Sequence, residues 1–132
     1  MNPPPKFSRR DYLEHIAEAA ELILEYTRGL SKDRFMNDRK TQQAVLMNFM
    51  TMGEAAVLLK NEHSAFIAEH ADIPWDKMRG MRNILTHEYW NINLEVVWET
   101  VVTNVPDLRN KVGGLIDAAV RENQEPGINF PD

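Results

Sequence analysis

Apolar residues recur at spacings of three and four along most of this chain, which is the periodicity of one face of an α-helix. The longest such run starts after Asn93, a good helix N-cap, and continues to Ala119 without a miss. Its members are Leu94, Trp98, Val101, Val105, Leu108, Val112, Leu115 and Ala119. Proline lacks a backbone N–H, so Pro106 should kink or split this helix. We find no repeat and no convincing strand pattern, and the sequence therefore predicts an all-α fold.

Helix start and stop signals divide the rest of the chain. Ser8 with Asp11 resembles a capping box, and Asp38 is a good N-cap for a second long helix. Gly29 is a plausible stop for the first helix, and Pro74 stands where a third should begin. Short helical turns are expected after Ser31 and across residues 62–70. The expected inward faces are Tyr12, Ile16, Ala19, Ile23 and Tyr26, then Val45, Phe49, Met52, Ala56 and Leu59, then Phe66 and Ile67, and then Trp75, Met78, Met81 and Leu85.

Short links between long amphipathic segments imply an antiparallel four- to five-helix bundle. We expect one domain over residues 8–121, with tails at residues 1–7 and 122–132. Gly53 interrupts the second long helix where another element should pack closely. The last apolar run could serve dimerisation, or it could simply face the bundle core.

Composition limits the possible functions. The chain has no cysteine, so disulfides and thiolate metal sites are excluded, which fits a reducing cytoplasm. No apolar stretch is long enough to span a bilayer, and the first residues lack an apolar signal core. The net charge of −5 opposes a protein that coats nucleic acid generally, because phosphate affinity comes mainly from Lys and Arg. Any RNA contact must therefore be local, and DNA is not expected as a partner.

Basic residues form two groups in the sequence. Arg79 and Arg82, with Lys77 nearby, would supply a local positive patch. The second group is interspersed with aspartates and is most simply a solvated surface. Its members are Lys32, Arg34, Arg39 and Lys40.

Other site signals are weak. Three histidines each follow a glutamate, but the Glu-x-x-His spacing of di-iron bundles does not occur, so no metal site is expected. These histidines are His15, His63 and His70. Glycine-rich phosphate loops and a Gly-x-Ser-x-Gly elbow do not occur either. The tryptophans Trp75, Trp90 and Trp98 are interpreted as core or interface residues, with stacking on a base as the less favoured alternative.

The segment 81–89 carries the chemistry. Arginine can hold a phosphate through a planar fork of donors, and histidine can transfer protons near neutral pH. In a regular helix Arg82 and His87 would point about 140° apart, so they converge poorly if the helix continues. Asn83 and His87 would share a face, as would Arg82 and Thr86. The site therefore works best if the helix ends near Thr86, or if two copies meet in a symmetric dimer.

A purely structural interpretation of the same residues stays open at this point. Arg82 could pair with a carboxylate such as Glu54, and His87 could simply lie at a helix C-terminus. Tyr89, after a helix end, could be a half-buried packing residue. Glu54 could also fix the Arg82 side chain for function.

These residues belong to a longer pattern that resembles the HepT-type toxins of the HEPN superfamily. The pattern runs from about Asp11 to Leu108. It comprises residues 11–16, 26–29, Phe35 with Asp38, 41–45 with Asn48, 53–55, Pro74 and Trp75, 80–83 leading to His87 and Tyr89, 97–101 and 106–108. Its most specific part is Arg82, His87 and Tyr89 in the spacing Arg-x4-His-x-Tyr.

The resemblance implies a homodimeric, metal-independent endoribonuclease that acts as a toxin and needs no cofactor. It implies a partner, a minimal nucleotidyltransferase antitoxin that transfers AMP from ATP to Tyr89. The hypothesis for cleavage is attack by the RNA 2′-hydroxyl on the adjacent phosphorus. His87 would move the protons, Arg82 would stabilise the phosphorane, and Asn83 would orient the phosphate or His87.

Two other functions remain open. HEPN domains can also be non-catalytic modules that bind nucleotide or position a nucleotidyltransferase. A structural dimeric bundle in which Arg82 is only an ion-pair member is the second alternative.

Overall fold

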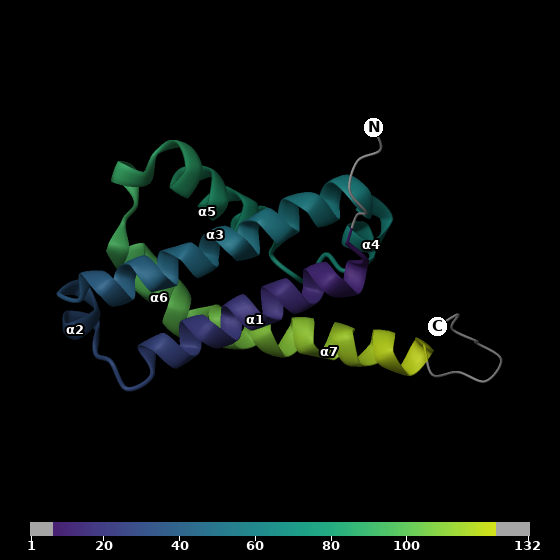
Figure 1. Cartoon of the computed structure of the whole chain (residues 1–132), viewed down its shortest axis with the longest axis horizontal. Coiled ribbons are helices and arrows are strands. Elements are labelled where there is room, and N and C mark those ends of the chain that lie inside the picture. Colours follow the sequence, from purple (N-terminus) through teal and green to yellow (C-terminus); the bar gives the residue numbers. More distant parts are fainter. Residues whose placement is uncertain (1–6, 124–132) are drawn as a thin grey trace.

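The computed structural model describes residues 7–123, and all regular structure in this range is helical. The elements are α1 (Arg9–Thr27), α2 (Lys32–Met36), α3 (Arg39–Glu62), α4 (Ser64–Glu69), α5 (Trp75–His87), the 3₁₀ turn η1 (Tyr89–Asn91), α6 (Leu94–Thr103) and α7 (Val105–Asn123). α1 packs against both α3 and α7, and α3 packs against α5 (Figure 1). The prediction of an all-α bundle is confirmed.

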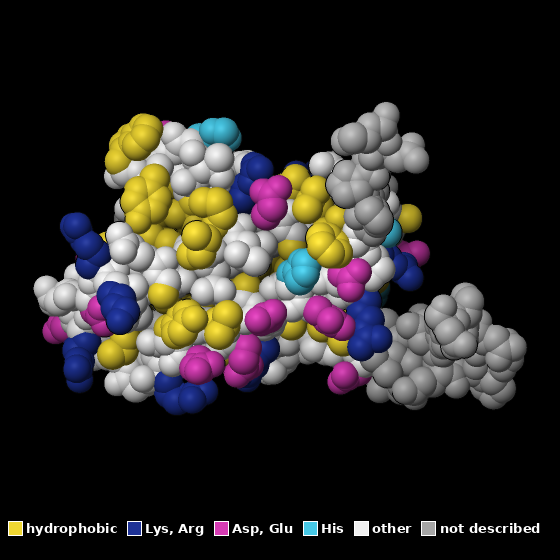
Figure 2. Space-filling model, viewed as in Figure 1, with side chains coloured by type: hydrophobic (Ala, Val, Ile, Leu, Met, Phe, Trp, Pro, Cys, Tyr) yellow, Lys and Arg dark blue, Asp and Glu magenta, His cyan; other side chains and the backbone are white. Residues whose placement is uncertain are grey.

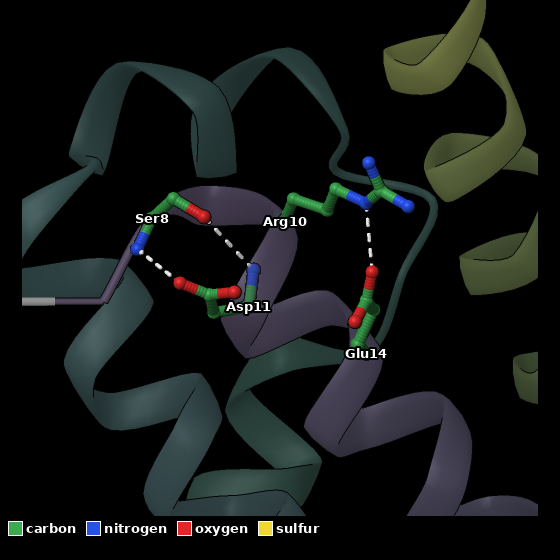
Figure 3. A network of polar contacts seen from close by, with 4 residues as sticks. All are labelled: Ser8, Arg10, Asp11 and Glu14. Atoms are coloured by element: carbon green, nitrogen blue, oxygen red, sulfur yellow. Dashed lines mark hydrogen bonds and ion pairs between the residues drawn. The ribbon is translucent and has the colours of Figure 1, made fainter. Parts of the chain in front are cut away.

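The ends of the helices follow the sequence signals. In α1 the Ser8 Oγ accepts from the Asp11 N–H at 3.1 Å, while Asp11 Oδ2 accepts from the Ser8 N–H at 3.0 Å (Figure 3). The backbone hydrogen bond from Ser8 lowers the pKa of Asp11, because it stabilises the carboxylate. One turn on, Arg10 Nε lies 2.7 Å from Glu14 Oε1. The predicted capping box is confirmed.

Other boundaries also agree with the prediction. Asp38 caps α3 by accepting from the Thr41 N–H at 3.1 Å, and Asn93 caps α6. Gly29 follows α1 with φ +76°, a conformation that residues with a Cβ rarely adopt. The long apolar run is divided at Asn104, just before Pro106, as expected. α7 continues to Asn123. Residues 1–6 and 124–132, which hold most of the two expected tails, lie outside the described residues.

The core is apolar and matches most of the predicted faces. Fully buried side chains come from α1, α2, α3, α6 and α7 and include Leu13, Ile16, Ile23, Phe35, Val45, Met52, Leu59, Val97, Val105 and Val112. Tyr26 was expected inward and is instead exposed, because Thr27, four residues after Ile23, continues the buried row. The Thr27 hydroxyl donates to the Ile23 carbonyl at 2.8 Å. None of the described helices is both long enough and apolar enough to cross a membrane.

Gly53 sets the distance between α3 and α5. A Cβ at this position would lie 2.3 Å from the Cβ of Arg82 and 2.5 Å from the carbonyl oxygen of Met78. Neither atom is the end of a flexible side chain, so any larger residue must push the two helices apart. The close approach places Arg82 beside Glu54, the residue that follows Gly53.

We expect Gly53→Ala to lower the free energy of unfolding by about 1–3 kcal/mol, because overpacking at a tight helix contact costs that much. Gly80→Ala in α5 is the matched control, since nothing lies within 4 Å of a Cβ built there. That control should be neutral or stabilising by up to about 1 kcal/mol, because alanine favours helix over glycine. Urea unfolding of both variants gives the comparison, and a Gly53→Ala protein as stable as the control would contradict the close contact.

Candidate active site

α5 ends at the residue where the sequence suggested that it should. His87 is the last helical residue and is exposed, and the Glu88 N–H still donates to the Ile84 carbonyl at 2.8 Å. Glu88 then leaves the helix with φ −141° and ψ 47°. Tyr89, 47% exposed, begins η1 directly afterwards. The chain thus presents an imidazole and a phenol at one end of α5.

The Arg82 guanidinium is held by two neighbours. Its Nε donates to Glu54 Oε2 at 2.9 Å, and its Nη1 donates to Asn83 Oδ1 at 2.9 Å. The Arg82 side chain is only 25% exposed, so its position is constrained by packing as well. Within residues 7–123 no group accepts a hydrogen bond from Nη2. The fork is therefore oriented, and it keeps donors for an anionic ligand.

This arrangement bears on two expectations from the sequence. The ion pair between Arg82 and Glu54 exists, as both the structural and the functional interpretations required. Asn83 was expected to share a helix face with His87 and to orient the phosphate or His87, and its role stays a prediction. Its side-chain oxygen accepts a hydrogen bond from Arg82. The Arg82 side chain is long enough to reach the side chain of its neighbour in sequence. Helical periodicity alone does not predict this contact.

His87 and Arg82 do not contact each other within one chain. Both lie in α5, where five residues correspond to about 140° of rotation. No hydrogen bond to the imidazole of His87 occurs within the part of the chain that the structure describes. A shared substrate, or a second copy of the chain, would have to join the two groups.

The expected positive patch is divided. Arg79 forms an ion pair with Asp76, and Arg82 faces Glu54. Lys77 lines an apolar groove of about 610 Å³ between α5 and α6, a groove that neither arginine lines. The helix thus turns Lys77, Arg79 and Arg82 toward different neighbours, and their joint role as a local positive patch stays a prediction.

Thr86 has a supporting contact. Its hydroxyl lies 3.8 Å from the sulfur of Met50 on α3, within the hydrogen-bond range for sulfur. Thr86 and Arg82 are four residues apart, so both face α3. The last turn of α5 is thus anchored beside the guanidinium.

Charge limits the faces that an RNA could approach. Glutamates lie exposed along α1 at Glu14, Glu18, Glu21 and Glu25. Figure 2 shows acidic side chains along α1, with hydrophobic ones over the adjoining part of α3 and the end of α5. The acidic face would repel phosphates, which leaves the α5 end as the more favourable side.

The other histidines make no metal site. Among residues 7–123, no group of three or more metal-ligating side chains lies close enough to hold an ion.

Near His63, the buried Tyr12 hydroxyl donates to both carboxylate oxygens of Glu62 at 3.0 Å. Burial raises the pKa of Tyr12, because the phenolate would be poorly solvated.

The tryptophans differ in their surroundings. Trp75 is buried, and its Nε1 donates to the His70 carbonyl at 2.9 Å. Trp98 is partly buried against the ring of Phe35, with centroids 5.1 Å apart. Trp90, expected in the core or an interface, is 79% exposed in this chain. It stands in η1, a single 3₁₀ turn without buried residues, so no apolar helix face carries it inward.

This chain is similar to known proteins over most of its length. Residues 16–113 match the family described as ribonuclease HepT-like. A probable ribonuclease HepT from Thermococcus cleftensis is 43% identical over 106 residues, which are 80% of this chain and 94% of the relative. Candidate RNases from Caldanaerobacter subterraneus and Methanocaldococcus jannaschii are 35% and 36% identical, over 81% and 78% of this chain and 93% and 83% of theirs. No solved structure gives a significant match.

We expect Arg82→Ala and Glu54→Ala each to change the free energy of unfolding by less than about 1 kcal/mol, because partly exposed ion pairs contribute little. Arg82→Ala keeps the Cβ that contacts Gly53, so helix packing should survive. A double-mutant cycle measured by urea unfolding isolates the pair. A coupling of several kcal/mol would show instead that Arg82 serves mainly to hold the bundle together.

Proposed function

This chain belongs to the ribonuclease HepT-like family, and on that premise we propose that it is a metal-independent endoribonuclease, the toxin of a toxin–antitoxin pair. The observation that carries the proposal is the oriented Arg82 fork on the helix that ends in the exposed His87. An anion-binding group and a proton-transfer group then lie on one short helix. The range matched to the family, residues 16–113, spans both positions.

The proposed reaction is an internal transesterification of RNA. The 2′-oxygen attacks the adjacent phosphorus, so a bond from phosphorus to O2′ forms while the bond to the 5′-oxygen breaks. An imidazole of His87 takes the proton of the 2′-hydroxyl, and a protonated imidazole gives one to the leaving 5′-oxygen. The products are a 2′,3′-cyclic phosphate and a 5′-hydroxyl.

Arg82 supports this step by charge. Negative charge builds on the phosphorane oxygens, and donors already aimed at them need no reorganisation. The contacts to Glu54 and Asn83 supply that orientation. The Arg82 side chain keeps 25% of its surface exposed beside Glu54, which leaves part of it open to an incoming phosphate.

Two copies of the chain would complete the site. His87 and Arg82 are separated within one chain, and the reaction needs both a base and an acid. In a symmetric dimer the two His87 imidazoles would share these roles around one groove. The homodimer is part of the proposal.

Tyr89 is proposed as the site of silencing. A nucleotidyltransferase antitoxin would attach AMP to its hydroxyl, forming a bond from the phenolic oxygen to the α-phosphorus of ATP and releasing pyrophosphate. The exposed ring follows His87 by two residues. The added phosphate would compete with RNA for Arg82.

Purified protein, verified by mass as unmodified, should cleave RNA in excess EDTA, and His87→Ala should lose at least about 100-fold of that rate, as expected for a general acid or base. His15→Ala, a histidine on α1 outside the site, is the matched control and should keep the rate. End analysis should find 5′-hydroxyl products. Products with a 5′-phosphate contradict the scheme, and no cleavage of tRNA or mRNA would favour a non-catalytic binding module, a role compatible with the acidic net charge of −5.

Tyr89→Phe should resist silencing when incubated with the nucleotidyltransferase and ATP, and its mass should not increase by adenylyl units. Tyr26→Phe is a fitting control, because Tyr26 is exposed to a similar extent, 42% against 47%. The control should still gain the adenylyl group and lose activity. Adenylylation of Tyr89→Phe would assign the modification to another residue.

A further inference from the structure

Trp90 is the most exposed large hydrophobic side chain in residues 7–123, at 79%. Tryptophan is usually well buried, because its ring contributes a large apolar area. Leaving the ring in water forgoes that stabilisation. Such a residue is therefore informative when it stands beside a candidate active site.

The indole is presented on a well-held turn. The Asn91 N–H donates to the Glu88 carbonyl at 2.8 Å, and the Ile92 N–H donates to the Tyr89 carbonyl at 3.2 Å. The Asn91 side chain also donates to Glu88 Oε1 at 3.1 Å. Ile92 packs against the core directly afterwards. The turn is thus fixed at both ends, so Trp90 needs little ordering before it binds.

The neighbours of Trp90 favour a nucleobase over another protein surface. Glu88 and Asn91 flank the turn and are exposed, whereas the centres of protein interfaces are depleted in charge. Trp90 does not line the apolar groove between α5 and α6. Two exposed rings in sequence, Tyr89 and Trp90, beside these polar groups suit bases, which have an apolar face and polar edges.

Trp90 and His87 are near enough in the chain to contact the same RNA substrate. Trp90 follows His87 by three residues, with only Glu88 and Tyr89 between the last residue of α5 and the indole. A base attached near the reacting phosphate can span that separation. The carboxylate of Glu88 disfavours a phosphate at the ring, so the base and not the backbone would meet the indole.

We propose that Trp90 stacks on a nucleobase beside the phosphate bound by Arg82, and that the substrate is therefore RNA with an unpaired base at the cleavage site. This inference rests on the proposed ribonuclease function. Bases inside an A-form duplex are already stacked and offer no free face, whereas loops and single strands do. Stacking accepts every base, so Trp90 selects for single-strandedness and not for sequence.

Binding is tested with His87→Ala, which should hold RNA without cutting it. Adding a single-stranded oligoribonucleotide should quench the tryptophan fluorescence of this variant. The double variant that also carries Trp90→Phe should show no such quenching. Trp98→Phe is the control that should keep the quenching, since Trp98 packs on Phe35. Trp90→Leu, which retains an apolar side chain without the ring, should bind about 5- to 150-fold more weakly, and Trp90→Phe should restore most of the affinity.

The outcomes separate this inference from the proposed function. If the unsubstituted protein cuts no RNA but the quenching depends on Trp90, the stacking role stands and the ribonuclease function fails. If cleavage occurs but Trp90→Leu binds and cuts single-stranded RNA like the unsubstituted protein, the stacking role is overturned. A second result would also overturn it: Trp90→Leu converts a dimer into a monomer in sedimentation velocity, and RNA does not quench the tryptophan fluorescence of His87→Ala. The ring would then be a contact between copies.

Discussion

The close contact at Gly53 is the constraint on which the candidate site depends. Without a side chain there, the backbone of α5 approaches α3 until the Cβ of Arg82 meets the space that a Cβ of residue 53 would fill. The next residue along α3, Glu54, is then within hydrogen-bond distance of the guanidinium. Packing, and not the ion pair alone, therefore positions the Arg82 guanidinium that we propose to bind phosphate, which agrees with the small energies of exposed ion pairs.

The other residues with a proposed function lie within a few positions at the end of α5. His87 closes the helix, Tyr89 starts the 3₁₀ turn and Trp90 follows with its ring in solvent. A chain with net charge −5 cannot rely on diffuse attraction to RNA. The proposed contacts of one oriented guanidinium and one exposed aromatic ring offer a local alternative, because each would recognise a different part of a nucleotide.

Local signals in the sequence predicted the fold well. The caps at Ser8, Asp38 and Asn93 depend on neighbours a few residues away, so sequence is sufficient to find them. Gly53 and Glu54 could also be singled out, since a glycine within a helix suggests close packing. The exposure of Trp90 and Tyr26, the contact of Asn83 with Arg82 and the divided basic patch could not be foreseen. They depend on how α5 and η1 sit against the bundle, which the period of apolar residues does not specify.

His87 and Arg82 are proposed to cut RNA through the 2′-hydroxyl without a metal. Two RNAs that differ only in a 2′-deoxy group on the 5′ side of the cleaved phosphate should be compared in EDTA. The all-ribose RNA should be cleaved, and its 2′-deoxy counterpart should not be cleaved at that phosphate, because the nucleophile is then missing. Equal cleavage of both RNAs would contradict this proposal, since another nucleophile would have to break the bond.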